Sequence, residues 1–451
     1  MSHEAIIITG GMVATEYGTL EVDIIVRNGR IAGLVEGADG IPGQRINATG
    51  LVIFPGGVDM HTHLLRRPIT VEREGFSYQA AAGGITTVVE MPHGDPLVHD
   101  VDSLRQKHEL AARSAIVDFG LYAAAIGQDA SELVSLRHEG VLAFKAFLCK
   151  SSPGFPMLDD AALVRCLQSM HQMDTLLIVH AENDGLLQDG MARMTADGRI
   201  DPLAHAESRP PIVESEAVAR AIHLARYTGA RLHIAHVSTG EATHAIGEAQ
   251  ADGVPVTCET CPQYLVMDES DLERLGPFAR CAPPLRNRAD VEALWAAVAD
   301  GTINAICSDH SPYSVAEKEA GITNIFQAPL GLNMIDVMLS SIVDEGIHRR
   351  GLSWTRFANL SAAEPARILG LYPTKGSIRV GADADLAIWD LDHEWEVTAN
   401  TYSSERSWTP LEGRRLRGRV VRTIRRGQTI YADGAISASK GSGQFLMPGS
   451  H

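Results

Sequence analysis

The central part of the chain alternates short apolar runs with longer amphipathic segments. Segments 101–114 and 214–227 have the periodicity of helices with one apolar face. Eight apolar runs of strand length lie at residues 52–58, 86–91, 117–123, 142–147, 176–179, 231–235, 254–257 and 303–307. Eight β/α units over about 320 residues predict a (β/α)8 TIM barrel, in which functional side chains gather at the carboxyl ends of the strands.

The two ends of the chain have a different pattern. Both contain short apolar runs separated by turn signals, with Asn28-Gly29 near the start and Arg426-Gly427 near the end. This shared pattern predicts that the termini meet in one small β domain. We therefore expect residues 1–54 and 374–451 to form that domain around a barrel of residues 55–373. The Gly- and Ser-rich stretch 437–451 is expected to be loosely held.

Composition narrows the class of protein. With 451 residues, of which 45% are hydrophobic and 21% charged, the chain has the composition of a large globular protein. Its net charge of −17 argues against a nucleic-acid partner, because phosphate binding needs a basic surface. We find no apolar stretch long enough for a membrane span and no signal-peptide pattern. Six widely spaced cysteines fit a reducing cytoplasm, and we interpret Cys258 and Cys261 as structural.

Residues that bind metals occur at the ends of five of the apolar runs. His61 and His63 close the first run, and residues at i and i+2 of a strand share a face. The later runs carry Lys145 in the fourth, His180 at the end of the fifth, His236 at the end of the sixth and Asp309 after the eighth. Because the carboxyl ends of barrel strands meet, this set predicts a metal centre.

The chemistry of the predicted centre follows from its ligand types. Imidazole and carboxylate suit zinc, and also manganese, cobalt or iron. A lysine on a barrel strand is desolvated, which lowers its pKa and leaves an amine that can take up carbon dioxide as a carbamate. A carbamate of Lys145 could bridge two divalent ions about 3.5–4 Å apart, which would hold a bridging hydroxide. We interpret Asp309 as both ligand and general base, and His310 as a residue that holds neighbouring groups in place.

These residues belong to a longer series of short motifs. The series comprises residues 55–63, 83–87, 144–147, 179–183, 236–238, 261–265, 282–286, 308–312 and 381–386. In this combination the chain resembles the amidohydrolase superfamily, specifically its cyclic amidases. The resemblance implies a barrel with a β-sandwich built from both termini, and a binuclear metal centre bridged by carboxylated Lys145. It also implies hydrolysis of a small cyclic amide or ureide by a homodimer or homotetramer.

Differences within the family favour one substrate class. Leu65 stands where dihydroorotases have an arginine, and Lys150 where dihydropyrimidinases and D-hydantoinases have a tyrosine. Allantoinases resemble the chain at 144–147, 308–312 and 408–414, but differ at 93–94 and 327–332. L-hydantoinases resemble it most, at residues 90–92, 117–122, 152–155, 276–278 and 330–332.

We therefore favour a hydantoinase that opens a hydantoin to an N-carbamoyl amino acid, with the metal-bridging hydroxide attacking the ring carbonyl. The alternative is an allantoinase, which converts allantoin to allantoate. Dihydropyrimidinase, dihydroorotase, a noncatalytic scaffold and a mononuclear deaminase are less favoured. The complete ligand set argues against a scaffold, and deaminases of this superfamily generally lack the lysine found here as Lys145.

Substrate contacts are expected at a few further positions. In this family, backbone groups near a Pro-Pro turn grip the ureide edge, which here points to Ala282. By alignment, Gln327 occupies a comparable place after the eighth strand. Lys150, Arg66 and Arg67 lie near the predicted mouth, where they could select an anionic substituent or be solvated surface charges.

Overall fold

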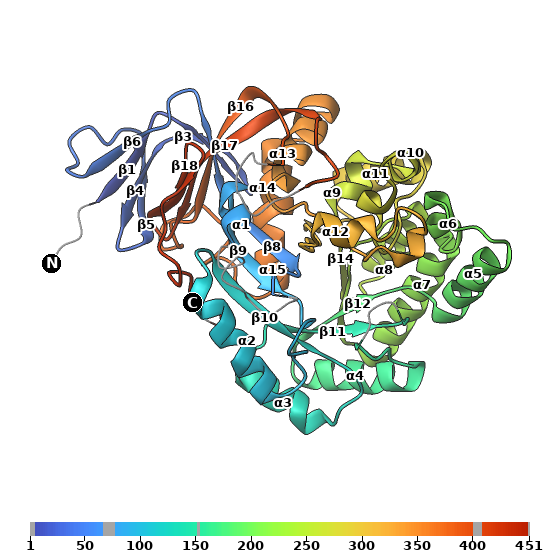
Figure 1. Cartoon of the computed structure of the whole chain (residues 1–451). Helices are drawn as coiled ribbons and strands as arrows, with labels where there is room; N and C mark the ends of the chain where they lie inside the picture. Colours follow the sequence, from blue (N-terminus) through green and yellow to red (C-terminus); the bar gives the residue numbers. More distant parts are fainter. Residues whose placement is uncertain (1–4, 66–76, 151–153, 400–407, 450–451) are drawn as a thin grey trace.

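The computed structural model describes residues 5–65, 77–150, 154–399 and 408–449. The expectations for Arg66 and Arg67 therefore lie outside the described residues. Figure 1 shows a barrel ringed by helices, with a β-sandwich on one side that contains strands from both the blue and the red ends of the chain. The predicted fold class is confirmed.

The barrel consists of eight parallel strands that are neighbours in the order of the sequence. They are β8 (Gly57–Thr62), β9 (Ile85–Glu90), β10 (Asp118–Ala124), β11 (Ala143–Phe147), β12 (Leu176–His180), β13 (Arg231–Ile234), β14 (Val256–Thr260) and β15 (Ala305–Ile306). A parallel bridge between Thr62 and His310 closes the ring, and the His63 N–H donates to the His310 carbonyl oxygen at 2.9 Å. Closure brings the first and last strand ends together.

Helices cover the outside of the barrel. The longer ones are α2 (Val101–Ser114), α3 (Ala130–His138), α4 (Asp160–Gln172), α5 (Asp184–Ala196), α7 (Pro211–Thr228), α8 (Gly240–Ala251) and α11 (Arg288–Asp300). The start of α2 is fixed by the Asp100 carboxylate, which accepts from the Ser103 N–H at 2.8 Å. None of the helices in the described residues combines the length and hydrophobicity that crossing a bilayer requires.

Shorter helices fill the connections. They are α1 (Tyr78–Ala82), α6 (Pro202–Glu207), α9 (Pro262–Val266), α10 (Glu269–Leu275), η2 (Gly276–Ala279), α12 (Val315–Glu319), η3 (Ile325–Gln327), α13 (Met338–Ile342), η4 (Val343–Arg349), α14 (Trp354–Ala358), η5 (Asn359–Ala363) and α15 (Glu364–Ile368). Several of them follow β14 and β15, so the connections at this end of the barrel are long enough to build the wall of a site.

The sandwich has two sheets. A four-stranded sheet in the order β5-β4-β1-β6 contains β1 (Ile6–Thr9), β4 (Asp23–Arg27), β5 (Arg30–Val35) and β6 (Gln44–Asn47). A seven-stranded sheet in the order β19-β18-β17-β16-β7-β2-β3 contains β2 (Met12–Thr15), β3 (Gly18–Glu21), β7 (Val52–Pro55), β16 (Leu386–Glu396), β17 (Arg415–Arg425), β18 (Gln428–Ala432) and β19 (Ala435–Ile436). Buried Ile8, Ile24, Ile53, Leu386 and Ile424 form part of a shared core.

The apolar run at residues 52–58 is two strands instead of the single barrel strand that its pattern predicts. Strand β7 belongs to the sandwich, where Pro55 pairs with Leu386 of β16. The first barrel strand, β8, begins at Gly57. Between the two strands, a Cβ added at Gly56 would lie 2.4 Å from the Thr86 side chain, so only glycine fits where the chain passes from one sheet to the other.

The expectation that residues 437–451 are loosely held is wrong for the described part of this segment. The Phe119 N–H donates to the Gln444 carbonyl oxygen at 2.9 Å, and the Leu446 N–H donates to the Phe119 carbonyl oxygen at 2.8 Å. The Phe119 and Phe445 rings are 5.6 Å apart between centroids. The chain end therefore packs against the start of β10, at the amino end of the barrel.

Candidate active site

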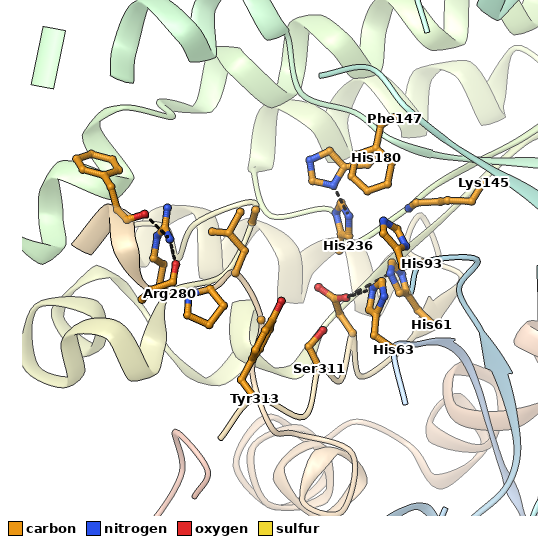
Figure 2. A pocket seen from close by; sticks show the side chains of 17 residues that line it. His61, His63, His93, Lys145, Phe147, His180, His236, Arg280, Ser311 and Tyr313 are labelled. Atoms are coloured by element: carbon orange, nitrogen blue, oxygen red, sulfur yellow. Dashed lines mark hydrogen bonds and ion pairs between the residues drawn. The ribbon is translucent and has the colours of Figure 1, made fainter. Parts of the chain in front are cut away.

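A cavity of about 320 Å³ opens at the carboxyl end of the barrel, a size typical of small-molecule sites. All six predicted metal ligands line it, together with Ala282. Figure 2 shows Lys145 and the four predicted histidine ligands close together in the cavity. The remaining lining residues are His93, Phe147, Arg280, Ser311, Tyr313, Phe326, Ala328, Pro329, Leu330 and Gly331. The cavity therefore has a floor rich in imidazoles and a wall that is largely apolar.

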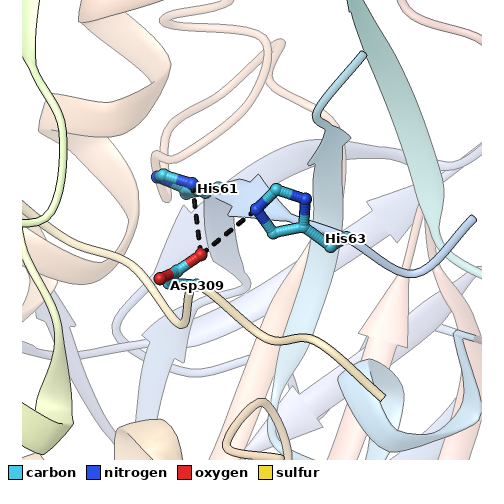
Figure 3. Close-up of side chains that lie close together, drawn as sticks. All are labelled: His61, His63 and Asp309. Carbon is cyan, nitrogen blue, oxygen red and sulfur yellow. Dashed lines mark ion pairs between the residues drawn. The ribbon is translucent and has the colours of Figure 1, made fainter. Parts of the chain in front are cut away.

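One part of the floor joins the first and last strand ends. The Nε2 atoms of His61 and His63 lie 3.3 and 3.2 Å from Asp309 Oδ1 (Figure 3). Burial favours a neutral carboxyl, but the two histidines outweigh it and hold the pKa of Asp309 well below its usual range. Asp309 also has a φ of 47°, a left-handed conformation that is uncommon for aspartate and concentrates at functional sites.

A second pair of histidines lies beside the first. His180 Nδ1 is 2.9 Å from His236 Nε2, and both rings are buried. Burial lowers the pKa of both imidazoles, and that of His236 falls well below its usual value. Both rings are therefore neutral near pH 7, which is the form that binds metal ions.

Lys145 projects from β11 into the same cavity with only 1% of its surface exposed. Its Nζ has no hydrogen-bond partner within the described part of the chain, and it lies 5.4 Å from the centroid of the Phe147 ring. Burial lowers the pKa of Lys145 to about 8. A buried, unpartnered amine is unfavourable, so this atom is suited to forming a bond to a further group.

Taken together, these residues fit a divalent metal centre. Four buried imidazoles and one ionised carboxylate are the donor types that zinc and similar ions prefer. His61, His63 and Asp309 lie close enough for their ligand atoms to share one ion. Lys145 adds a buried amine to the same cavity, and this amine has no hydrogen-bond partner among the described residues.

Two buried carboxylates that sequence reasoning missed fix the histidine rings. Glu259, at the end of β14, contacts His61 Nδ1 and lies 3.3 Å from His233 Nε2. Although burial opposes ionisation, His61 and His233 hold the pKa of Glu259 well below its usual value. Glu182 Oε2 contacts His180 Nε2 at 2.6 Å. Such partners set the orientation of ligand rings. The available signal was a glutamate two residues after the seventh apolar run at 254–257.

His310 has the kind of contacts that its predicted positioning role requires. Its Nδ1 accepts the backbone N–H of Met334 at 3.0 Å and of Ile335 at 3.3 Å. Its carbonyl oxygen accepts the His63 N–H. The residue therefore ties the backbone next to Asp309 both to β8 and to the segment that follows.

The structure does not place two of the expected substrate contacts at the cavity. Gln327 is exposed at the end of η3, while Phe326 and Ala328 on either side line the cavity. The tight turn of η3 directs the glutamine to solvent. The Lys150 side chain is 70% exposed, and its Nζ lies 3.7 Å from Asp184 Oδ2. Ala282, in contrast, is at the cavity as expected.

His93, in the loop after β9, also lines the cavity, and the sequence analysis did not propose it as a site residue. Its ring centroid is 4.9 Å from that of His63. Lys107, buried on α2, holds this loop because its Nζ donates to the carbonyl oxygens of Met91, at 2.8 Å, and of His93. The sequence pattern around His93 does not distinguish it from a histidine in an ordinary surface loop.

One cysteine, Cys149, lies next to this floor, because its Sγ donates to Glu182 Oε2 at 4.0 Å and lies close to His180. All six cysteines lie in the described residues, none of them forms a disulfide, and all are buried; burial raises the pKa of Cys258 to about 12. Cys258 and Cys261 therefore stay protonated, and neither belongs to a metal-type cluster in the residues described.

Comparison with known proteins defines the family. Residues 52–430 match the model of the Amidohydrolase family, and the chain belongs to that family. An L-hydantoinase of Paenarthrobacter aurescens is 32% identical over 446 residues, covering 98% of this chain and 97% of that protein. An allantoinase of Rubrobacter xylanophilus is 38% identical over 454 residues, covering 99% of this chain and 98% of that protein. A solved L-hydantoinase (dihydropyrimidinase) from Arthrobacter aurescens superposes with a TM-score of 0.95 at 31% identity, covering 98% of this chain and all of that one.

Proposed function

We propose that this protein is a metal-dependent cyclic amidohydrolase that opens a hydantoin ring to an N-carbamoyl amino acid. The observation that carries the proposal is the convergence of six ligand-type side chains on one small cavity: His61, His63, Lys145, His180, His236 and Asp309. Relatives named hydantoinase and allantoinase, which cover nearly the whole chain, support the same reaction class.

These six residues would hold two divalent ions, with zinc preferred over manganese, cobalt or iron because imidazole donors dominate. Lys145, as its carbamate, would supply a two-oxygen anion shared by both ions, and its unpartnered Nζ supports this assignment. When bound, such ions polarise a carbonyl and lower the pKa of water. Glu259 and Glu182 would keep the histidine rings in their binding orientation.

Asp309 is the residue that would move the proton. Its carboxylate is ionised at neutral pH and points into the cavity, so it can accept a proton during attack on the ring carbonyl. The same group would return the proton to the ring nitrogen as the C–N bond breaks. His310 would hold the Asp309 backbone in place, and the backbone at Ala282 would contact the ureide edge.

The wall of the cavity favours a hydantoin with a substituent at ring position 5. Phe326, Ala328, Pro329 and Leu330 give the cavity an apolar lining. This surface suits a hydrocarbon stem better than the ureido group of allantoin. An allantoinase is the second candidate, because the relative with that name shares 38% identity with this chain, against 32% for the L-hydantoinase.

A substrate panel tests the proposal. The metal-loaded protein would be assayed on hydantoin, both enantiomers of several 5-substituted hydantoins, allantoin, dihydrouracil and dihydroorotate, with ring opening followed by chromatography. We expect the 5-substituted hydantoins to be opened fastest, with a preference for one enantiomer. Allantoin as the best substrate would replace the first proposal with the second. No turnover with two ions bound per chain would reject both.

We also infer that the protein is a cytoplasmic homodimer or homotetramer. Six cysteines without a disulfide support a reducing compartment, and family resemblance supports the assembly. Light scattering coupled to size-exclusion chromatography would measure the assembly, and a monomer at micromolar concentration would contradict it.

A further inference from the structure

Arg280 stands at the end of the cavity away from Lys145 and the histidines (Figure 2). It follows η2, and its side chain lines the cavity although only 6% of the residue is exposed. Its backbone is fixed by Lys318, whose Nζ donates to the Arg280 carbonyl oxygen at 3.0 Å. The guanidinium is therefore a built-in part of the cavity wall.

Among the described residues, Nη1 is the one nitrogen of this guanidinium that donates a hydrogen bond to the protein. Nη1 donates to the carbonyl oxygens of Phe326, at 3.3 Å, and of Ala328. Within the described ranges, Nε is buried without a hydrogen-bond partner, and Arg280 forms no ion pair with a carboxylate. The fold has thus secured the position of the side chain, and within the described residues it leaves Nε and Nη2 without a hydrogen-bond partner.

Two neighbouring arginines show how this fold treats other buried guanidinium groups. Arg209 Nη1 lies 2.6 Å from Glu182 Oε2, and Arg286 Nη2 lies 3.5 Å from Glu214 Oε2. Both side chains are as buried as that of Arg280, and both meet a carboxylate. Arg280 differs because it faces the cavity, so a bound ligand can supply the carboxylate that would pair with its guanidinium.

The surroundings make this position favourable for an anion. Burial and the nearby Arg209 lower the pKa of Arg280 to about 9, so the group still carries its charge at neutral pH. An uncompensated buried charge is unfavourable, and an incoming carboxylate relieves it. The planar guanidinium also matches the two oxygens of a carboxylate.

We propose that Arg280 is a specificity residue that binds a carboxylate at the far end of the substrate's 5-substituent. The substrate class is then a 5-(carboxyalkyl)hydantoin, with its aliphatic stem along Ala328 and Leu330 and its ring at the histidines. Hydrolysis adds one water across the ring amide: a C–O bond forms, the C–N bond breaks and the nitrogen takes a proton. This inference rests on the proposed function.

Matched substrates test the role of the charge. Hydantoin-5-propionate, its neutral carboxamide analogue and unsubstituted hydantoin would be compared on the metal-loaded protein. We expect the wild type to prefer the propionate over the amide by about 10-fold or more in kcat/KM. Arg280→Met should lower kcat/KM for the propionate by about 10–100-fold and leave unsubstituted hydantoin within about threefold. The kcat/KM of Arg280→Lys for the propionate should lie between the values of the wild type and of Arg280→Met.

The control is Arg226→Met, which removes an arginine that is 52% exposed and paired with Asp252, and should change no ratio between substrates. An equal loss on all three substrates in Arg280→Met would show that the residue only supports the wall at Phe326 and Ala328. A wild type without preference for the propionate over the amide would also overturn the proposal.

Binding separates this inference from the proposed reaction. Calorimetry with hydantoin-5-propionate on the metal-loaded protein measures Kd without turnover. Weaker binding in Arg280→Met, with the amide unaffected, supports the carboxylate site even if no hydantoin is opened. Unchanged binding of the propionate in that variant contradicts it, whether or not the protein proves to be a hydantoinase.

Discussion

Two buried lysines at opposite ends of the barrel have opposite environments. Lys375, at the amino end, has its Nζ 2.5 Å from Asp118, 2.7 Å from Asp385 and 3.0 Å from Asp383. Lys145, at the carboxyl end, has no hydrogen-bond partner at Nζ among the described residues. Burial lowers the pKa of Lys145 to about 8, whereas three carboxylates overcome burial and raise the pKa of Lys375.

The difference shows what each end of the barrel is for. Lys375 links Asp118 at the start of β10 to Asp385 beside the sandwich, and Asp118 also accepts the Gln444 N–H at 2.8 Å. Such a saturated cluster fastens two parts of the fold together. Lys145, which is equally buried and has no hydrogen-bond partner among the described residues, lies at the other end, where barrels carry their chemistry.

The largest effect is expected at the carboxyl end, from Asp309→Asn. The amide can still occupy the site but cannot take up a proton, so turnover should fall by about 10²–10⁴-fold. Metal content, measured by plasma mass spectrometry, should stay close to that of the wild type. Near-normal activity of Asp309→Asn would contradict the role of Asp309 as the residue that carries the proton.

At the amino end, Lys375→Met should affect stability and not catalysis. Removing the ammonium takes the nearest cation away from Asp118, Asp383 and Asp385 and leaves the longer contacts to Arg30, Arg425 and Arg426. This loss should lower the free energy of unfolding by about 3–5 kcal/mol in urea denaturation. Activity per folded molecule should be unchanged. Arg226→Met, which breaks an exposed ion pair, is the control and should change stability by less than about 1 kcal/mol.

The pH dependence of this stability difference has a defined sign. Since the pKa of Lys375 is raised on folding, its contribution is fully present below the unfolded value of about 10.4 and is lost as the pH rises through the folded value. The difference in free energy of unfolding between wild type and Lys375→Met should thus be constant from about pH 7 to 9. It should shrink only at higher pH, where the lysine of the unfolded chain loses its proton. A gap that closes between pH 7 and 9 would contradict the assigned ion cluster.

A smaller effect is expected from Glu259→Gln. The glutamine keeps the size of the side chain but removes the charge that orients His61, so metal affinity or activity should fall by about 10–100-fold. Competition with a chelator would measure the affinity. If neither quantity changes, the contact between Glu259 and His61 does not support the centre.

Much of the site could be predicted because barrel geometry converts sequence position into spatial position. His61, His63 and His180 each close an apolar run, and parallel strands bring such ends together. Glu259 could not be found in this way, because its partner His61 lies 198 residues away and the pairing depends on how the barrel closes. Local periodicity contains no information about that distance.

Other predictions failed where local geometry decides orientation. Gln327 follows a residue that lines the cavity, but the turn of η3 exposes its side chain. The apolar run 52–58 looked continuous because Pro55 and Gly56, which end one strand and lead to the next, are themselves compatible with an apolar pattern. Arg280 was missed because its isolation from carboxylates is visible only in the folded chain.

The most direct test of this account is the metal content of Lys145→Ala. We expect two divalent ions per chain in the wild type and an unmodified fold by circular dichroism in the variant, together with loss of bound metal and of ring-opening activity. Intact-mass measurement under mild conditions should also find carbon dioxide on the wild-type chain and not on the variant. Two ions and full activity in Lys145→Ala would contradict the central role given to this unpartnered lysine.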